Sequence, residues 1–154
     1  MIRPLRRTLL TLFTAVALSA CASAQPVGSS LGPFTTDGCS MFPDRSALSK
    51  ADWCTCCVAH DLAYWRGGTA QERLEADTGL RSCVEQASGS SALADLMFTG
   101  VRSGGGPYFY TPYRWAYGWS FGRGYQALTA EESATAAALK AEYLATNPAL
   151  LCAK

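Results

Sequence analysis

The chain has 154 residues and a formal net charge of +1; 49% of its residues are hydrophobic and 16% are charged. This length suits one domain with its own hydrophobic core. The near-neutral charge, without a basic run in the body of the chain, argues against a nucleic-acid partner.

The first 20 residues have the pattern of an export signal. Three arginines within the first seven residues precede a mostly apolar stretch, residues 9–20. That stretch is short for a membrane span and has the length of a signal-peptide core. Without these residues, ten basic and twelve acidic side chains remain, a net charge of −2. We therefore expect an exported protein.

Two processing sites follow the signal. Residues 18–21 (LSAC) resemble a bacterial lipobox, in which Cys21 is lipidated and becomes the first residue. Cleavage after Ala24 is the alternative, because small residues precede it. We expect a tether over 21–33 and a domain over 34–154, in the bacterial cell envelope as a lipoprotein, or in a periplasmic or secreted form.

The number of cysteines agrees with export. Seven are present, and six remain if Cys21 is lipidated or removed. An even number in a small exported chain suggests three disulfide bonds. The spacing alone leaves their connectivity open. The six are Cys39, Cys54, Cys56, Cys57, Cys83 and Cys152.

Four helices are predicted from start and stop signals. Ser49 or Asp52 can cap the first helix, and the glycine pair at 67–68 ends it. The sequence Thr-Ala-x-Glu occurs at 69–72 and at 129–132, and each is a capping box that begins a helix. The expected helices end near residues 66, 86, 101 and 146, the third beginning near residue 92.

Residues 103–125 are the least regular part of the chain. They combine six glycines with nine aromatic side chains and contain no acidic residue. A long aromatic loop packed on the core is the simpler interpretation, with a β-hairpin as an alternative. The second interpretation is that this segment forms a wall of an apolar substrate slot or a surface that contacts lipid, since Trp and Tyr suit the boundary between water and lipid.

The strongest functional signal is the run 56–64, Cys-Cys-Val-Ala-His-Asp-Leu-Ala-Tyr. It contains His60, the only histidine of the chain, directly followed by Asp61. In a helix, Cys56, His60 and Tyr64 are four residues apart and share one face. The run therefore predicts a functional site rather than a set of residues that only pack in the core.

A carboxylate on the second helix can reach this histidine. The short glycine turn predicts antiparallel packing of the first two helices. At about 1.5 Å per residue, His60 lies roughly 10 Å and Asp77 roughly 13 Å from the turn, so they are nearly level. Glu72 and Glu75 are rival partners on the same helix.

A zinc site is an alternative use of this region. Cys and His are the usual zinc ligands, and Cys54, Cys56, Cys57 and His60 lie within seven residues. Cysteines of an exported protein are normally oxidised, however, which disfavours this alternative.

The motifs together resemble a known family. The sequence Asp-Gly-Cys at 37–39, the sequence Cys-Cys-x-x-His-Asp at 56–61 and Asp77 resemble the secreted phospholipase A2 superfamily, closest to its bacterial and fungal branch. The resemblance covers about residues 34–87. The expected fold is mainly α, with two long antiparallel disulfide-linked helices, a calcium loop, the aromatic loop or hairpin and a C-terminal helix.

The resemblance implies a role for each matching residue. His60 is the general base that activates water, and Asp77 orients the imidazole. Ca²⁺ is the implied cofactor, with Asp61, Asp37 and the Gly38 carbonyl as ligands. Tyr64 would brace Asp77. Asp44 is a turn residue or a rival ligand of the loop.

The resemblance also implies disulfide pairs and an activity. Cys39 would bond to Cys57 and Cys56 to Cys83, which leaves Cys54 for Cys152. The implied activity is calcium-dependent hydrolysis of a glycerophospholipid acyl ester at a membrane surface. The alternative is a non-catalytic, disulfide-stapled envelope protein that binds lipid or a protein partner. The oligomeric state is left open.

Overall fold

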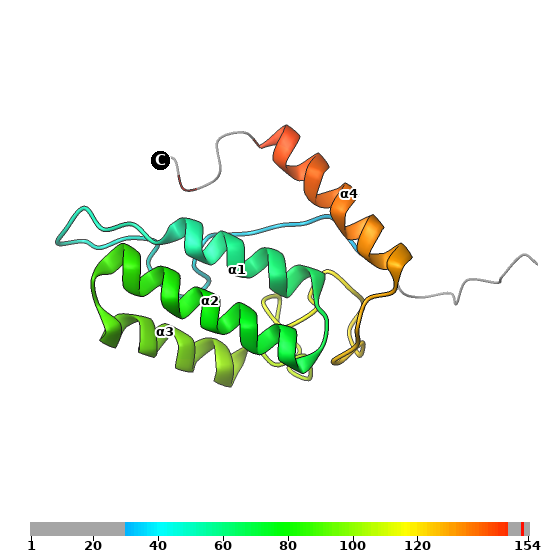
Figure 1. Ribbon diagram of the computed structural model, residues 1–154, viewed down its shortest axis with the longest axis horizontal. Coiled ribbons are helices and arrows are strands. Elements are labelled where there is room, and N and C mark those ends of the chain that lie inside the picture. The colour runs from blue at the N-terminus through cyan, green and yellow to red at the C-terminus, as the bar shows by residue number, and fades with distance from the viewer. Residues whose placement is uncertain (1–29, 148–151, 153–154) are drawn as a thin grey trace, which may run out of the picture.

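The computed structural model describes residues 30–147 and 152. The described residues form four helices and no β-strand: α1 (Cys54–Arg66), α2 (Ala70–Ser88), α3 (Ser91–Gly104) and α4 (Ala130–Thr146) (Figure 1). The expectation of a mainly helical fold is confirmed. The export signal, Cys21, Ala24 and most of the predicted tether lie outside the described residues.

The helix starts follow local signals of the sequence. Both predicted capping boxes are present, so α2 and α4 begin one residue after Thr69 and Thr129. Helix α1 begins at Cys54, whose N–H donates to Asp52 Oδ1 at 3.0 Å. Ser49 lies in the preceding loop and does not cap α1.

Helix α3 runs three residues beyond the predicted end. Its last turn is stabilised from outside the helix, because Arg73 Nη2 donates to the carbonyl oxygens of Val101 and Arg102 at 2.8 and 2.9 Å. Free carbonyls at a helix C-terminus need such partners. This long-range contact cannot be read from local sequence signals.

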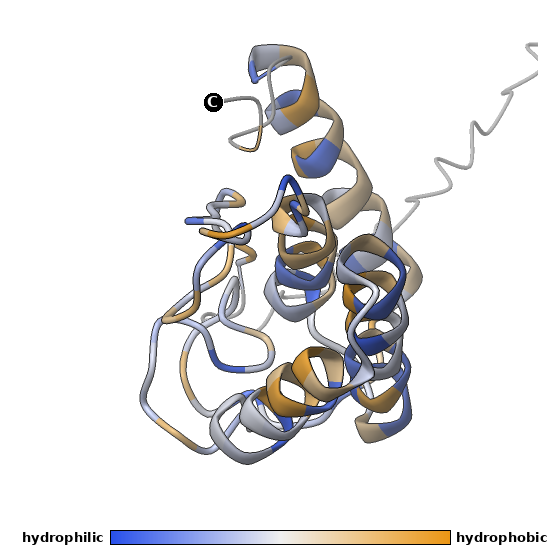
Figure 2. Ribbon diagram, turned by 90° about the vertical axis from the view of Figure 1, so that its left-hand side faces the viewer, coloured by the Kyte–Doolittle hydropathy of each residue, from blue (hydrophilic) through white to orange (hydrophobic). Residues whose placement is uncertain are grey.

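Helices α1, α2 and α3 lie side by side, while α4 stands at an angle to them (Figures 1 and 2). The bonds between α1 and α2 pair early positions of one helix with late positions of the other. A disulfide joins Cys56 to Cys83, and His60 bonds to Asp77 nearer the turn. The two helices therefore run in opposite directions and place these side chains level with one another.

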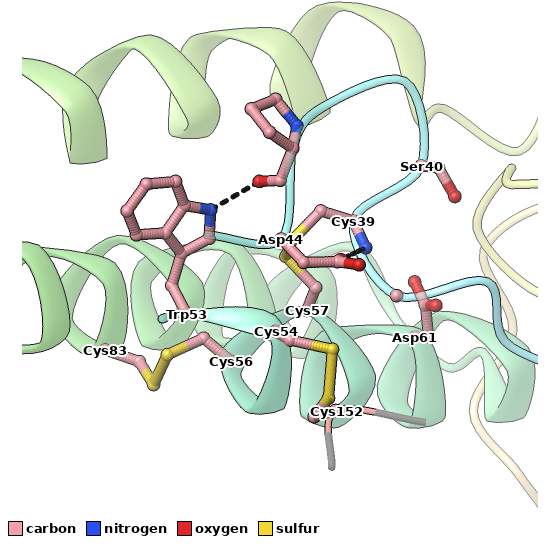
Figure 3. The surroundings of a disulfide bond; sticks show 12 residues. Cys39, Ser40, Asp44, Trp53, Cys54, Cys56, Cys57, Asp61, Cys83 and Cys152 are labelled. Atoms are coloured by element: carbon pink, nitrogen blue, oxygen red, sulfur yellow. Dashed lines mark hydrogen bonds between the residues drawn. A yellow bond between two sulfur atoms is a disulfide. The ribbon is translucent and has the colours of Figure 1, made fainter. Parts of the chain in front are cut away.

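Three disulfide bonds meet at the first turn of α1 (Figure 3). They are Cys39–Cys57, Cys54–Cys152 and Cys56–Cys83, with Cα–Cα distances of 5.0, 5.5 and 5.7 Å. These are the pairs that the resemblance implies. Because all three α1 cysteines are oxidised, none offers a thiolate to zinc, and the zinc alternative is not supported.

The domain begins before residue 34. Leu31 is buried in the core that contains Trp65 and Trp115. The Gly32 N–H donates to Gly118 O, and Trp65 Nε1 donates to Gly32 O, both at 2.8 Å. The last residues of the predicted tether are therefore packed parts of the domain rather than a spacer.

The aromatic segment is a loop, and the hairpin alternative is wrong. Trp115 and Trp119 are buried, and their indole N–H groups donate to the carbonyl oxygens of Gly68 and Arg66, at the turn after α1. Gly118 fits closely here, because a Cβ would collide with Trp65. The loop is therefore fixed over the α1–α2 turn by these side-chain contacts and by isolated backbone hydrogen bonds to the end of α1, rather than by a strand ladder.

None of the described helices is long and apolar enough to cross a membrane.

Candidate active site

The only histidine lies where α1 and α2 face one another. His60 Nε2 is 2.8 Å from Asp77 Oδ1, and both residues are buried, with 8% and 0% of their surface exposed. The predicted rivals are engaged elsewhere, since Glu72 bonds to Thr69 and Glu75 to Gln71. Among the described carboxylates, Asp77 is therefore the one that holds this imidazole.

Asp77 is held by three further side chains. Tyr64 OH donates to Asp77 Oδ1 at 2.8 Å, and Arg102 Nη1 donates to Asp77 Oδ2 at 2.6 Å. Arg73 Nε lies 3.7 Å from the same Oδ2. Burial alone would raise the pKa of Asp77, but the hydrogen bonds from His60, Arg102 and Tyr64 outweigh it and hold the pKa below its ordinary value. Asp77 is therefore an ionised acceptor at neutral pH.

The charge of Asp77 fixes the tautomer of the imidazole. An ionised carboxylate only accepts hydrogen bonds, so Nε2 of His60 carries the proton. Nδ1 is then the basic nitrogen, and no described residue forms a hydrogen bond to it. His60 lines a cavity, and Nδ1 is not one of the fully buried polar atoms that lack a partner, so it is open to a water or substrate molecule there.

Arg73 connects the site to the rest of the fold, and sequence reasoning missed it. It is buried, and Nε donates to Tyr64 OH at 3.0 Å while Nη1 donates to Tyr125 OH at 2.6 Å. With its bonds to two α3 carbonyls, it joins α1, α2, α3 and the aromatic loop. The planar guanidinium supplies several donors in fixed directions, which a lysine cannot do.

We expect Arg73→Lys to lower the free energy of unfolding by about 2–3 kcal/mol, because buried acceptors lose charged donors. Arg81→Lys is the matched control: Arg81 lies on the same helix but forms an exposed ion pair with Asp95. Lysine can still pair with Asp95 there, so this variant should unfold at nearly the same urea concentration as the wild type. Urea unfolding of both variants measures the difference, and equal stabilities would contradict the assigned role of Arg73.

Asp61 is the second carboxylate of the site. Thr36 Oγ1 donates to its Oδ2 at 2.6 Å. Burial raises the pKa of Asp61 to about 7, Thr36 opposes this rise, and the nearby charge of Asp37 adds to it. A carboxylate with a pKa this high gains much from a bound cation. Figure 3 shows Asp61 directed from α1 toward the loop that carries Cys39 and Ser40.

The predicted metal loop lies opposite Asp61. Asp37 Oδ1 accepts a hydrogen bond from Ser40 Oγ at 2.7 Å, and Asp44 Oδ1 accepts one from the Cys39 N–H at 2.8 Å. Gly38 has a φ of 86°, and a Cβ there would collide with the Asp44 carboxylate. Glycine is thus required at this turn, and Asp44 braces the loop.

Two adjoining cavities meet at Asp61. The larger, of about 380 Å³, has a mostly apolar lining that includes Gly38, His60 and Asp61. The smaller, of about 240 Å³, is lined by Asp37 and Asp61, among others. The two cavities therefore bring together the predicted base and metal ligands, and Asp77 lies behind His60.

The donor set at this junction fits calcium. Ca²⁺ prefers carboxylate, carbonyl and water oxygens, and two carboxylates line the smaller cavity, one of them with a raised pKa. The described residues hold no group of three or more His, Cys, Asp or Glu side chains close enough for a metal. A site here would therefore depend on backbone carbonyls and water as well as on Asp37 and Asp61.

Sequence reasoning missed three participants of the site. Thr36 and Arg102 lie 25 residues from the aspartates that they contact, and Arg73 contacts residues up to 52 positions away. Arg73 does have a local signal, because it precedes Asp77 by four positions on α2.

Comparisons of the chain with protein-family models, with curated proteins and with solved structures found no match.

Proposed function

We propose that this protein is a calcium-dependent phospholipid hydrolase of the phospholipase A2 type, which cleaves an acyl ester with an activated water molecule. The observation that carries the proposal is the His60–Asp77 pair: Nε2 is held by a buried carboxylate, and Nδ1 is left free at an apolar cavity. This is the arrangement that a general base needs.

The proposed reaction needs no nucleophilic side chain. His60 Nδ1 accepts a proton from water as the water oxygen attacks the ester carbonyl carbon, and Asp77 stabilises the imidazolium that forms. The imidazolium then returns the proton to the departing alcohol oxygen. The products are a fatty acid and a lysophospholipid.

The residues that would hold calcium are Asp61, Asp37 and the carbonyl of Gly38. When bound, calcium would polarise the ester carbonyl and stabilise the negative charge that develops on its oxygen. Thr36 donates to one oxygen of Asp61 and so fixes the orientation of this carboxylate beside the general base.

Exposed apolar and aromatic side chains, at the cavity and on the aromatic loop, support a substrate that lies in a membrane surface. Met41 and Leu96 both line the large cavity, yet 87% and 60% of their surfaces are exposed. Tyr108 and Tyr110 of the aromatic loop are 72% and 84% exposed. Such side chains suit the boundary between water and lipid. The export signal and three disulfides support a location in the bacterial cell envelope or outside the cell.

The proposal predicts that the purified, oxidised protein releases fatty acid from mixed phosphatidylglycerol and phosphatidylcholine vesicles when calcium is present. Excess chelator should abolish the release, because the oxyanion then loses its counter-charge. Added calcium should restore the release. Fatty-acid release measured by mass spectrometry tests this. A folded protein that releases no fatty acid with calcium would contradict the proposal and favour a non-catalytic lipid-binding or protein-binding role.

A further inference from the structure

One wall of the large cavity is formed by a glycine-containing face of α3. Leu96, Gly100 and Gly104 are four residues apart, so they follow one face of the helix. All three line the cavity, as do Met97 and Val101 of the adjacent row. His60 and Asp61 line the same cavity, so this apolar wall is continuous with the proposed site of hydrolysis.

Neither glycine is required by backbone geometry or by a close neighbour. Gly100 and Gly104 do not have positive φ angles. A Cβ atom added at either position would meet no heavy atom within 4 Å outside its own stretch of helix. Gly105 differs, since a Cβ there would collide with Tyr64. Glycine is less favourable than alanine inside a helix, so helix stability does not explain these residues. Their contribution is the free space that a missing side chain leaves along the cavity wall.

From this geometry we infer that Gly100 and Gly104, here called the glycine wall, set the length of the acyl chain that the cavity accepts. The inference rests on the proposed function, because it assigns the fatty-acyl part of the substrate to this wall. A cavity of about 380 Å³ is within the range of small-molecule sites. Its apolar lining suits an unbranched alkyl chain.

The inference can be tested by binding, independently of turnover. Octanoic, dodecanoic and hexadecanoic acids would compete with a fluorescent fatty-acid analogue for the oxidised protein. Each methylene that the cavity buries should raise affinity about fourfold, until the cavity is full. In Gly100→Leu the new side chain occupies the space beside the glycine wall, so the affinity should stop rising at a shorter fatty acid. Hexadecanoic acid should then bind at least about tenfold more weakly than to the wild type.

Two further variants keep the test interpretable. Gly79→Leu is the matched control, because a Cβ at Gly79 also meets no heavy atom within 4 Å, but Gly79 lies on α2 and lines neither cavity. It should bind all three acids as the wild type does. Gly100→Ala adds one methyl group and a better helix former, so it should fold at least as well and show a smaller shift in the same direction.

The same variants separate this inference from the proposed function. A wild type that binds no fatty acid, or a folded Gly100→Leu with an unchanged chain-length profile, would overturn the inference. If vesicles show no hydrolysis but Gly100→Leu shortens the preferred acid, the glycine wall is supported and the proposed catalysis fails. If vesicles are hydrolysed but Gly100→Leu keeps the wild-type preference between lauroyl and palmitoyl lipids, the enzyme is supported and the glycine wall fails.

Discussion

His60→Gln should lower the rate of fatty-acid release by about 10²–10⁴-fold while leaving the protein folded. General-base catalysis contributes about 10²–10⁴-fold, and His60 is the chain's only histidine, so no second imidazole can replace it. Glutamine can still donate an amide N–H toward Asp77, which keeps the buried carboxylate satisfied. It offers no basic nitrogen to water.

The readouts are the initial rate on mixed vesicles with calcium and the thermal midpoint of unfolding. Glu75→Gln is the control, because Glu75 is exposed on the helix that carries Asp77 and bonds only to Gln71 among the described residues. It should retain the wild-type rate. A folded His60→Gln that hydrolyses vesicles at the wild-type rate would rule out His60 as the general base.

The local parts of the structure were predictable from the sequence. The capping boxes at Thr69 and Thr129 place the starts of α2 and α4, because each satisfies free N–H groups within four residues. The level positions of His60 and Asp77 follow from helix rise and one short turn. These predictions needed only neighbouring residues and a single reversal of the chain.

The long-range parts were not predictable in the same way. Arg102 reaches Asp77 only because α3 packs on α2. Arg73 lies near Asp77 on α2, but its bonds to the aromatic loop and to the α3 carbonyls also depend on long-range packing. The path of the aromatic loop likewise depends on indole N–H groups that donate to distant carbonyls, such as Trp119 to Arg66. Its composition indicated a packed surface but left its backbone undetermined.

Asp61→Asn should weaken calcium binding by more than about a hundredfold and abolish calcium-dependent hydrolysis. Mutating a residue that only supports a metal ligand already lowers metal affinity about 10–100-fold. Asp61 is a direct ligand in the proposed site. Asparagine keeps an oxygen that can accept the Thr36 hydrogen bond, so the fold should survive. Calorimetric titration with calcium measures the affinity. Asp95→Asn, which changes an exposed aspartate on α3 outside both cavities, is the control.

The raised pKa of Asp61 makes the effect on stability depend on both pH and calcium. Between its ordinary value of 3.8 and about 7, the folded protein without calcium retains a proton that the unfolded chain releases. Stability from this group is therefore lost as the pH rises through that interval. Without calcium at pH 8, we expect Asp61→Asn to melt at a higher temperature than the wild type.

Added calcium should reverse that order, because binding stabilises only the folded wild type. Below pH 7 the wild type should lose about tenfold in calcium affinity per pH unit, since the ion must displace a proton from Asp61. Melting curves of both proteins at pH 5 and pH 8, with and without calcium, test all these expectations together. If the two proteins kept the same order under every condition, Asp61 would be a half-buried structural carboxylate, and the calcium site would have to be sought elsewhere.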